Sequence, residues 1–182
     1  MMERLPSRQR IRLPPESYKG PAAFSVTVST AGRAPLFKKP ETVQLCLSAL
    51  SETASLHHMD VLAYCFMPDH LHLLVQARDD GSFLRFMKGF KQISGYRYRR
   101  SAMQPLWQKG YYDHVLRREE DVNQVAEYIM HNPVRAGLVD SPGKYPSSGG
   151  IMAGDLKVAP TSVVREASSA GESRGEQVDD SA

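Results

Sequence analysis

Two histidines, His70 and His72, lie two positions apart in a strongly apolar stretch that runs from Val61 to Val75. Alternate residues of a β-strand point to the same face of a sheet, so both imidazoles would project from one face. Leu71 would then point to the opposite face, where an apolar residue belongs. Two neighbouring neutral imidazoles can hold one metal ion, although they can equally be half-buried histidines hydrogen-bonded to their neighbours.

A second pair of polar residues lies near the end of a later segment. Tyr128 and Asn132 are four positions apart, and residues at this spacing share one face of an α-helix. A phenol can act as a nucleophile, and an amide oxygen can be the third ligand of a divalent ion. The alternative for a helical tyrosine is packing on the apolar side of the helix.

The first half of the chain supplies the elements that would position the histidines. Residues 22–30 alternate and are β-branched, which predicts a strand. Two further strands are predicted over residues 60–66 and 70–76, and the short turn between them makes them antiparallel neighbours. The spacing of apolar residues predicts a helix over residues 41–56 and another over residues 83–100.

The second half would position the tyrosine. Residues 106–117 are predicted to contain a segment that leads into a strand, followed by the fourth strand itself. The acidic residues 119–121 favour the start of a helix, because carboxylates suit the positive end of its dipole. That helix carries Tyr128 and ends near Asn132, which precedes a proline. Residues 134–139 are predicted to form a short turn of helix or a loop.

The resulting order is strand, helix, strand, strand, helix, strand and a final helix. This order is typical of the split βαβ arrangement, an α+β class that includes ferredoxin-like and RNA-recognition-type (RRM-like) folds. We therefore expect an antiparallel sheet with helices on one face, and a C-terminal helix that carries Tyr128. The other face of the sheet would be free for nucleic acid or for a site.

The composition favours a single domain with a polyanionic partner. The chain has 182 residues and a net charge of +3, with a basic excess in residues 1–150 and an acidic excess in residues 151–182. A basic domain is typical of polyanion binding, although such an excess can also be ordinary solvated surface. Cys46 and Cys65 lie in apolar segments and indicate reduced core residues of a cytoplasmic protein. No apolar run is long enough to span a membrane.

Three regions are expected along the chain. Residues 1–17 indicate a flexible basic lead-in, which lacks the apolar segment of a secretory signal. Residues 18–148 would form the folded domain. Residues 149–182 are rich in Ser, Gly, Ala, Glu and Asp and contain no aromatic residue, which predicts a disordered acidic tail. Within this tail, the short apolar patch at residues 158–164 could dock transiently.

Several spaced blocks give the chain a resemblance to a known family. The blocks run from Met67 to Leu74, from Leu106 through Tyr112 to Arg117, from Tyr128 to Val134, and from Tyr145 to Ser148. Together they resemble the single-tyrosine HUH transposases, and most closely the branch associated with repetitive extragenic palindromes. Insertion-sequence members usually carry Gln where this chain has Asn132, and the Asn-Pro pair is similar to that of the palindrome-associated branch.

The resemblance implies roles for individual residues. His70, His72 and Asn132 would bind a divalent metal, Mg²⁺ or Mn²⁺, and Tyr128 would be the nucleophile. Tyr128 would attack a phosphodiester of single-stranded DNA and form a 5′-phosphotyrosine link, which a 3′-hydroxyl later reverses. The metal would stabilise the charge that develops on the phosphate oxygens.

Further residues could contact single-stranded or hairpin DNA. Tyr112 and Lys109 belong to an aromatic and basic cluster that could stack unpaired bases, and His114 could contact DNA or be a surface histidine. Phosphates of a hairpin stem could be bound by basic residues of the predicted helix at 83–100, namely Arg85, Lys88, Lys91, Arg97, Arg99 and Arg100. The resemblance allows a monomer or a homodimer.

Two other functions stay open on the same fold. One is a binder of hairpin nucleic acid without catalysis, which would keep the basic surface and lose the chemistry. The other is a hydrolytic metallonuclease, in which water attacks the phosphate and Tyr128 only packs. A covalent protein–DNA adduct would separate these functions from the transposase.

Overall fold

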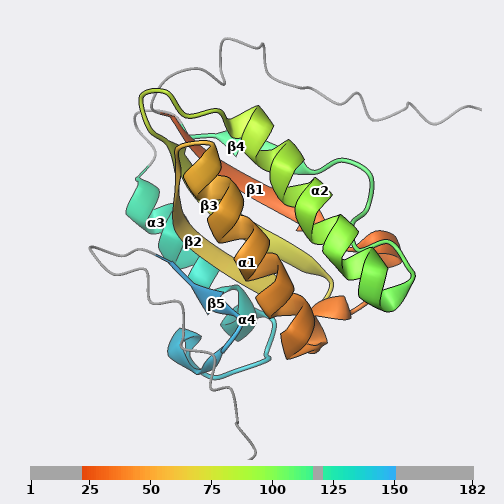
Figure 1. The fold of residues 1–182 in the computed structure, drawn as a ribbon. Coiled ribbons are helices and arrows are strands. Elements are labelled where there is room, and N and C mark those ends of the chain that lie inside the picture. The colour runs from red at the N-terminus through yellow and green to blue at the C-terminus, as the bar shows by residue number, and fades with distance from the viewer. Residues whose placement is uncertain (1–21, 117–120, 151–182) are drawn as a thin grey trace, which may run out of the picture.

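The computed structural model describes residues 22–116 and 121–150, and the strands within them form one five-stranded sheet in the order β4-β1-β3-β2-β5 (Figure 1). These strands pair antiparallel throughout. They are β1 (Ala23–Ser29), β2 (Met59–Met67), β3 (His70–Ala77), β4 (Tyr112–Val115) and β5 (Ser148–Gly149). The helices are α1 (Pro40–Leu56), α2 (Phe83–Ala102), α3 (Val122–Met130) and α4 (Asn132–Arg135). The predicted α+β, ferredoxin-like class is confirmed.

Strand β3 is central and fixes the direction of the two histidines. It pairs with β1 from Ala23 opposite Gln76 to Ser29 opposite His70, and on its other side with β2. Only Pro68 and Asp69 separate β2 from β3, so the two strands are antiparallel neighbours, as the sequence predicted.

Helices α1 and α2 cover one face of the sheet (Figure 1). Leu71 and Leu73 of β3 point into this layer and are fully buried, together with Phe24 of β1. The Phe24 ring stacks on Phe83 of α2, with the ring centroids 4.1 Å apart. Burial of each such side chain contributes about 1.5–3 kcal/mol, so this layer is the main source of stability. The prediction that Leu71 points to the core is confirmed.

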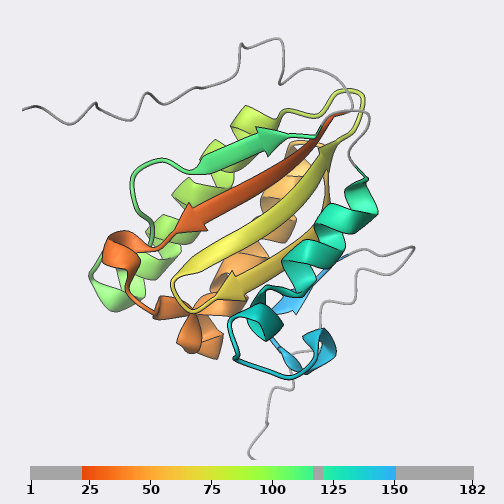
Figure 2. The ribbon, with the colours of Figure 1, turned by 180° about the vertical axis from the view of Figure 1, so that it is seen from behind.

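Helix α3 packs on the opposite face, which corrects the expectation that this face would be free (Figure 2). Ala126 and Ile129 of α3 are buried against Ala63, Cys65 and Leu74 of the sheet. Helix α3 packs there because its apolar side chains must be buried, and the apolar residues of β2 and β3 on this face bury them. Strands β1 and β4 are left uncovered on this face (Figure 2).

The segment before β4, which the sequence predicted as the approach to a fourth strand, is a bend. Gly110 has a φ of 81°, which is a left-handed backbone that interrupts an extended strand. The Lys91 ammonium donates to the carbonyl oxygens of Gln108 and Gly110, at 2.9 and 2.5 Å, and holds the bend against α2. Trp107 forms an isolated bridge to Thr30, and regular pairing begins only at Tyr112.

Two short elements near the C-terminal end of the domain differ from the prediction. Helix α4 begins at Asn132, earlier than the short turn expected over residues 134–139. Strand β5 was not predicted, since two residues that pair with β2 leave no readable alternation. Tyr145 secures this region because its hydroxyl donates to the Phe66 carbonyl oxygen at 2.8 Å.

The remaining expectations concern cysteines, membranes and the chain ends. Cys46 and Cys65 are both free and buried, as predicted. Among the described residues, no helix has the length and apolar character needed to cross a membrane. The lead-in predicted at residues 1–17 and all but the first two residues of the predicted tail lie outside the described residues.

Candidate active site

The His70 and His72 side chains meet on the face of the sheet that carries α3. Their Nε2 atoms are 3.0 Å apart, and the two rings lie edge to face. The second nitrogen of each ring, Nδ1, contacts a neighbouring polar side chain. His70 Nδ1 lies 2.6 Å from the Asp69 carboxylate, and His72 Nδ1 lies 3.2 Å from the Thr27 hydroxyl. The strand pleat therefore aims both Nε2 atoms at one region, and two neighbours fix the ring orientations.

These contacts determine which nitrogens can bind a metal. An ionised carboxylate only accepts hydrogen bonds, so His70 Nδ1 is the donor to Asp69 and its Nε2 carries a lone pair. His72 Nδ1 can donate to Thr27 or accept from it, because a hydroxyl does both. When Nδ1 donates, His72 Nε2 also carries a lone pair. When it accepts, His72 Nε2–H donates to His70 instead.

The spacing of the two nitrogens fits a shared ion. Two ligands that each lie about 2.1 Å from one ion, at right angles to each other, are about 3.0 Å apart. The observed separation is 3.0 Å, so the pair matches two adjacent positions of an octahedron. The described residues contain no group of three or more His, Cys, Asp or Glu side chains that could hold a metal. A third protein ligand would therefore have to be an amide, a hydroxyl or a carbonyl.

The electrostatic surroundings keep His72 neutral. The pKa of His72 is lowered to about 4, mainly by burial and to a smaller extent by charge interactions with His70 and Arg135. Burial alone would raise the pKa of Asp69, but hydrogen bonds and charges from His70 and Arg33 outweigh it and lower that pKa. The Arg33 guanidinium lies 3.3 Å from the Asp69 carboxylate. At neutral pH the site thus combines a neutral His72 with an ionised Asp69.

Tyr128 lies on α3, which packs on this face, and Asn132 is the first residue of α4. Helix α3 begins at the Asp121 cap, whose carboxylate accepts from the Asn123 backbone N–H at 2.8 Å. The Asn132 amide group donates to the carbonyl oxygens of Tyr128 and Ile129, at 3.2 and 3.1 Å. These bonds hold the side chain against the end of α3. Asn132 Oδ1 in turn accepts from Arg135 Nη2 at 2.9 Å, so a metal ion at this oxygen would share it with, or displace, that arginine.

The Tyr128 side chain is open to solvent, with 56% of the residue exposed. Its ring is not part of the apolar layer that buries Ala126 and Ile129. Packing on the apolar side of α3 therefore does not account for Tyr128, whereas an exposed phenol can reach a large substrate. The sequence predicted Tyr128 and Asn132 on one helix, but α3 ends at Met130 and Asn132 begins α4. The Asn132 amide still donates to the Tyr128 backbone carbonyl, which keeps the two residues close together.

The structure adds Arg135, which the sequence reasoning missed. Its guanidinium lies over the Tyr128 ring, with Cζ 3.6 Å from the ring centroid, and donates to Asn132 Oδ1 at 2.9 Å. A signal was present in the sequence. Arg135 follows Tyr128 by seven positions and Asn132 by three, which are spacings that return to one helix face.

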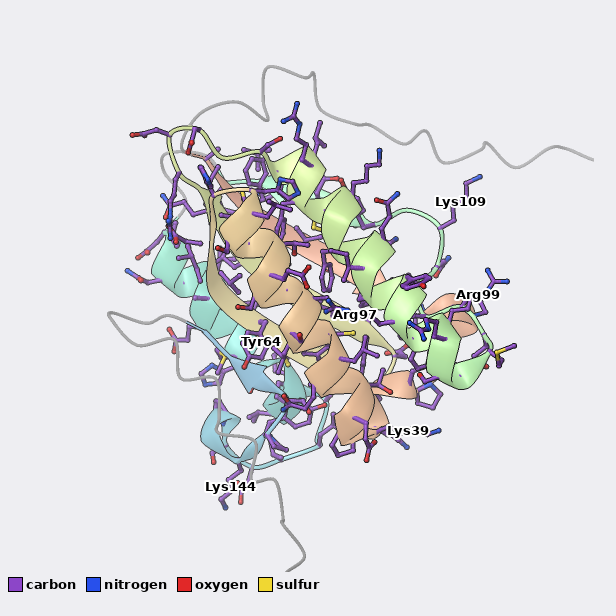
Figure 3. The ribbon with its side chains drawn as sticks, viewed as in Figure 1. Lys39, Tyr64, Arg97, Arg99, Lys109 and Lys144 are labelled. Carbon is purple, nitrogen blue, oxygen red and sulfur yellow. The ribbon has the colours of Figure 1, made fainter. Side chains whose placement is uncertain are left out.

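The basic residues predicted on α2 lie on the other side of the sheet. Figure 3 shows Arg97 between α1 and α2, and Arg99 on the outer side of α2. Arg97 pairs with Glu52 of α1 at 2.6 Å, and Lys91 is bonded to the loop before β4. The structure does not bring α2 together with His70 and His72. The other predicted phosphate contacts are exposed on α2, namely Arg85, Lys88, Arg99 and Arg100.

Tyr112 and His114 of β4 lie on the same face as the histidine pair. Directly opposed residues of neighbouring strands point to one face, and Thr27 is opposite both His72 and Tyr112. His114 is opposite Ser25, one row further along the same strands. Tyr112 is 70% exposed, so its ring is available beside the candidate site. Lys109 is exposed in the loop before β4 (Figure 3).

Comparison with known proteins relates this geometry to a family. Residues 22–132 match the family described as transposase IS200 like. A Haemophilus influenzae protein assigned to the REP-associated tyrosine transposases is 30% identical over 116 residues, which is 56% of this chain and 64% of that protein. This chain thus aligns with a little under two thirds of that relative's length.

A solved structure has the same fold. It is described as the REP-associated tyrosine transposase bound to a REP hairpin, and it superimposes with a TM-score of 0.62 at 20% identity. The match covers 81% of this chain and 82% of that one. The family match includes both histidines, Tyr128 and Asn132, and it ends before Arg135.

Proposed function

This chain belongs to the IS200-like transposase family, and on that premise we propose that it cuts and rejoins single-stranded DNA with Tyr128 as the nucleophile. His70, His72 and Asn132 Oδ1 are the proposed ligands of a divalent ion, Mg²⁺ or Mn²⁺. The proposed catalytic domain spans residues 18–148. Because the substrate is DNA, the proposed place of action is the bacterial cytoplasm.

One observation carries this proposal above all others. The two Nε2 atoms lie 3.0 Å apart, and each ring is backed by a hydrogen-bonding partner at Nδ1. Histidines that bind metals are commonly oriented by such a partner on the second nitrogen. The same face of the sheet carries α3, on which Tyr128 is exposed. These features support the proposal of an ion site on the same face as an accessible nucleophile.

The proposed reaction exchanges one phosphate ester for another. The Tyr128 oxygen forms a bond to phosphorus and loses its proton, while the 3′-oxygen of the cleaved strand leaves as a hydroxyl. The 5′-phosphate stays linked to Tyr128 until a 3′-hydroxyl attacks it and restores the phenol. A bound divalent ion would stabilise the negative charge on the non-bridging oxygens and lower the barrier to attack.

His70 and His72 have a defined task in this scheme. Their neutral rings supply two nitrogen ligands, and the Asp69 and Thr27 contacts keep the lone pairs aimed at one point. Nitrogen ligands are less suited to Mg²⁺ than oxygen ligands, so we expect Mn²⁺ to support the reaction at least as well. Asn132, at the start of α4, would contribute an oxygen ligand directly after the helix that bears the nucleophile.

The proposed substrate is hairpin DNA with an unpaired segment. A REP-associated tyrosine transposase of the same fold has been solved bound to a REP hairpin, and the Haemophilus relative is assigned to that group. In this chain, no helix covers β1 and β4 on the face of the histidines (Figure 2). Exposed Tyr112 on that face is suited to stack on a base.

A covalent adduct tests this proposal against its two rivals. Labelled hairpin DNA with Mn²⁺ should give an adduct that survives denaturation, and Tyr128→Phe should abolish it while DNA binding is retained. Tyr96→Phe is the matched control, because Tyr96 is an exposed tyrosine of α2 whose ring also lies beside an arginine, Arg100. Cleavage without any adduct would favour a metallonuclease. Binding without cleavage would favour a non-catalytic hairpin binder.

A further inference from the structure

Arg135 occupies a central position among the candidate site residues. Its guanidinium contacts the Tyr128 ring at 3.6 Å and Asn132 Oδ1 at 2.9 Å. One side chain thus contacts both the proposed nucleophile and the proposed third ligand.

The charge of Arg135 has no acidic partner within the described part of the chain. Most other basic side chains with a recorded partner there are bonded to a carboxylate, as in the pairs Arg33–Asp69, Arg78–Asp60, Arg97–Glu52 and Lys144–Asp140. Arg135 instead bonds to a neutral amide and lies over a neutral ring. An exposed cation of this kind is electrostatically prepared for an anion.

The contacts also leave most of its donors available. A guanidinium has five N–H donors arranged around a planar rim, and the recorded bond uses Nη2. Contact with the Tyr128 ring at 3.6 Å engages the flat face of the cation. The N–H groups on the rim can therefore donate to a second group without loss of the stacking.

We propose that Arg135 binds the phosphate that Tyr128 attacks. This inference rests on the proposed function, since it takes Tyr128 as the nucleophile. The fork of an arginine matches two oxygens of a phosphate, whereas a lysine offers a compact point charge. Arg135 would hold the phosphate next to the phenol and would stabilise the negative charge that develops during attack. The stacking would at the same time orient the Tyr128 ring.

This assignment differs from the phosphate contacts predicted from sequence. Those side chains lie on α2, on the far side of the sheet from the histidine pair (Figure 3). They could bind a stem at a distance, but the structure does not bring them to the nucleophile. Arg135 is on α4, directly after the helix that carries Tyr128.

The experiment compares Arg135→Gln and Arg135→Lys with the intact chain. Lys39→Gln is the matched control, because Lys39 is an exposed cation before α1, on the opposite side of the sheet (Figure 3). Binding of labelled hairpin DNA is measured in EDTA at several salt concentrations, so the readout needs neither metal nor chemistry. Thermal unfolding of each variant shows whether the fold is intact.

Arg135→Gln is expected to weaken binding about tenfold, as expected for loss of a charged hydrogen-bonded contact. The slope of log affinity against log salt should fall by about 0.7, which corresponds to one phosphate of a single strand. Arg135→Lys should keep most of that slope because it keeps the charge. At saturating DNA with Mn²⁺, the rate of adduct formation should fall at least tenfold in Arg135→Gln and less in Arg135→Lys.

Three results would overturn the inference. The first is an Arg135→Gln variant with the affinity and salt slope of the intact chain. The second is an equal loss in Lys39→Gln, which would indicate a general charge effect. The third is weakened binding with an unchanged rate at saturation, because Arg135 would then contact a different phosphate. Failure of the proposed function is distinct, since it would appear as an undiminished adduct in Tyr128→Phe.

Discussion

His70 and His72 face each other through their Nε2 atoms at 3.0 Å, on the side of β3 that looks towards α3. In the protein without metal, this contact is consistent with a chain of hydrogen bonds from Thr27 through both rings to Asp69. With a metal, the same separation suits two adjacent ligands. The two rings therefore need to move little between the metal-free and the metal-bound protein. What must change is the position of the His72 proton, which would move from Nε2 to Nδ1 so that Nε2 can bind the metal.

The support behind His70 should set the metal affinity. Asp69→Asn is expected to lower Mn²⁺ affinity about tenfold, because the amide holds the His70 ring less firmly and reduces its basicity. Titration of free Mn²⁺ by electron paramagnetic resonance measures this. Asp60→Asn is the control, since its carboxylate pairs with Arg78 away from the histidines. Equal affinity in all three proteins would show that Asp69 does not support a metal ligand.

The low pKa of His72 should make stability depend on pH. In the folded chain His72 stays neutral down to about pH 4, while its ordinary value is 6.5. Between these values the unfolded chain binds a proton that the folded chain does not, so stability should fall as the pH decreases from 6.5 towards 4. Below about 4 this loss levels off.

Melting temperatures in EDTA test this dependence. His72→Gln removes the titrating group, so its melting temperature should fall less steeply across this window than that of the intact chain. Thr27→Val keeps His72 and serves as the comparison, since it removes only the hydroxyl at Nδ1. Parallel pH curves for the intact chain and His72→Gln would contradict the prediction.

Tyr112 should contribute to the binding of unpaired DNA. Its ring is 70% exposed on the uncovered face, in the same row as Thr27 and His72. Loss of one base stack costs about 1 kcal/mol or more, so Tyr112→Ala should weaken hairpin binding roughly fivefold. Tyr96→Ala is the control, because Tyr96 is exposed on α2. Fluorescence anisotropy measures both, and a larger loss from Tyr96 would move the interface to α2.

Removal of the predicted acidic tail should leave the fold unaffected. Truncation after Gly150 is expected to leave the melting temperature unchanged, because the tail composition offers too little apolar surface for folding. DNA affinity should be equal or higher, most visibly at low salt, where charge competition is least screened. A marked drop in melting temperature would indicate instead that the apolar patch at residues 158–164 docks on the domain.

Local patterns in the sequence predicted the longer strands and helices and the direction of side chains within them, but not the short strand β5 or the start of α4. The alternation of β3 put His70 and His72 on one face and Leu71 on the other. These relations depend only on the geometry of one strand or one helix. They hold wherever that element packs.

Tertiary structure decided which elements share a face. The buried contacts of Ala126 and Ile129 with β2 and β3 put α3 on the histidine side, and α2 covers the opposite side with its arginines. The register of β1 brought Tyr112 into the row of His72, and the fold of α4 stacked Arg135 on Tyr128. Such relations depend on how apolar surfaces far apart in the sequence pack together. The periodicity of a single segment does not predict that packing.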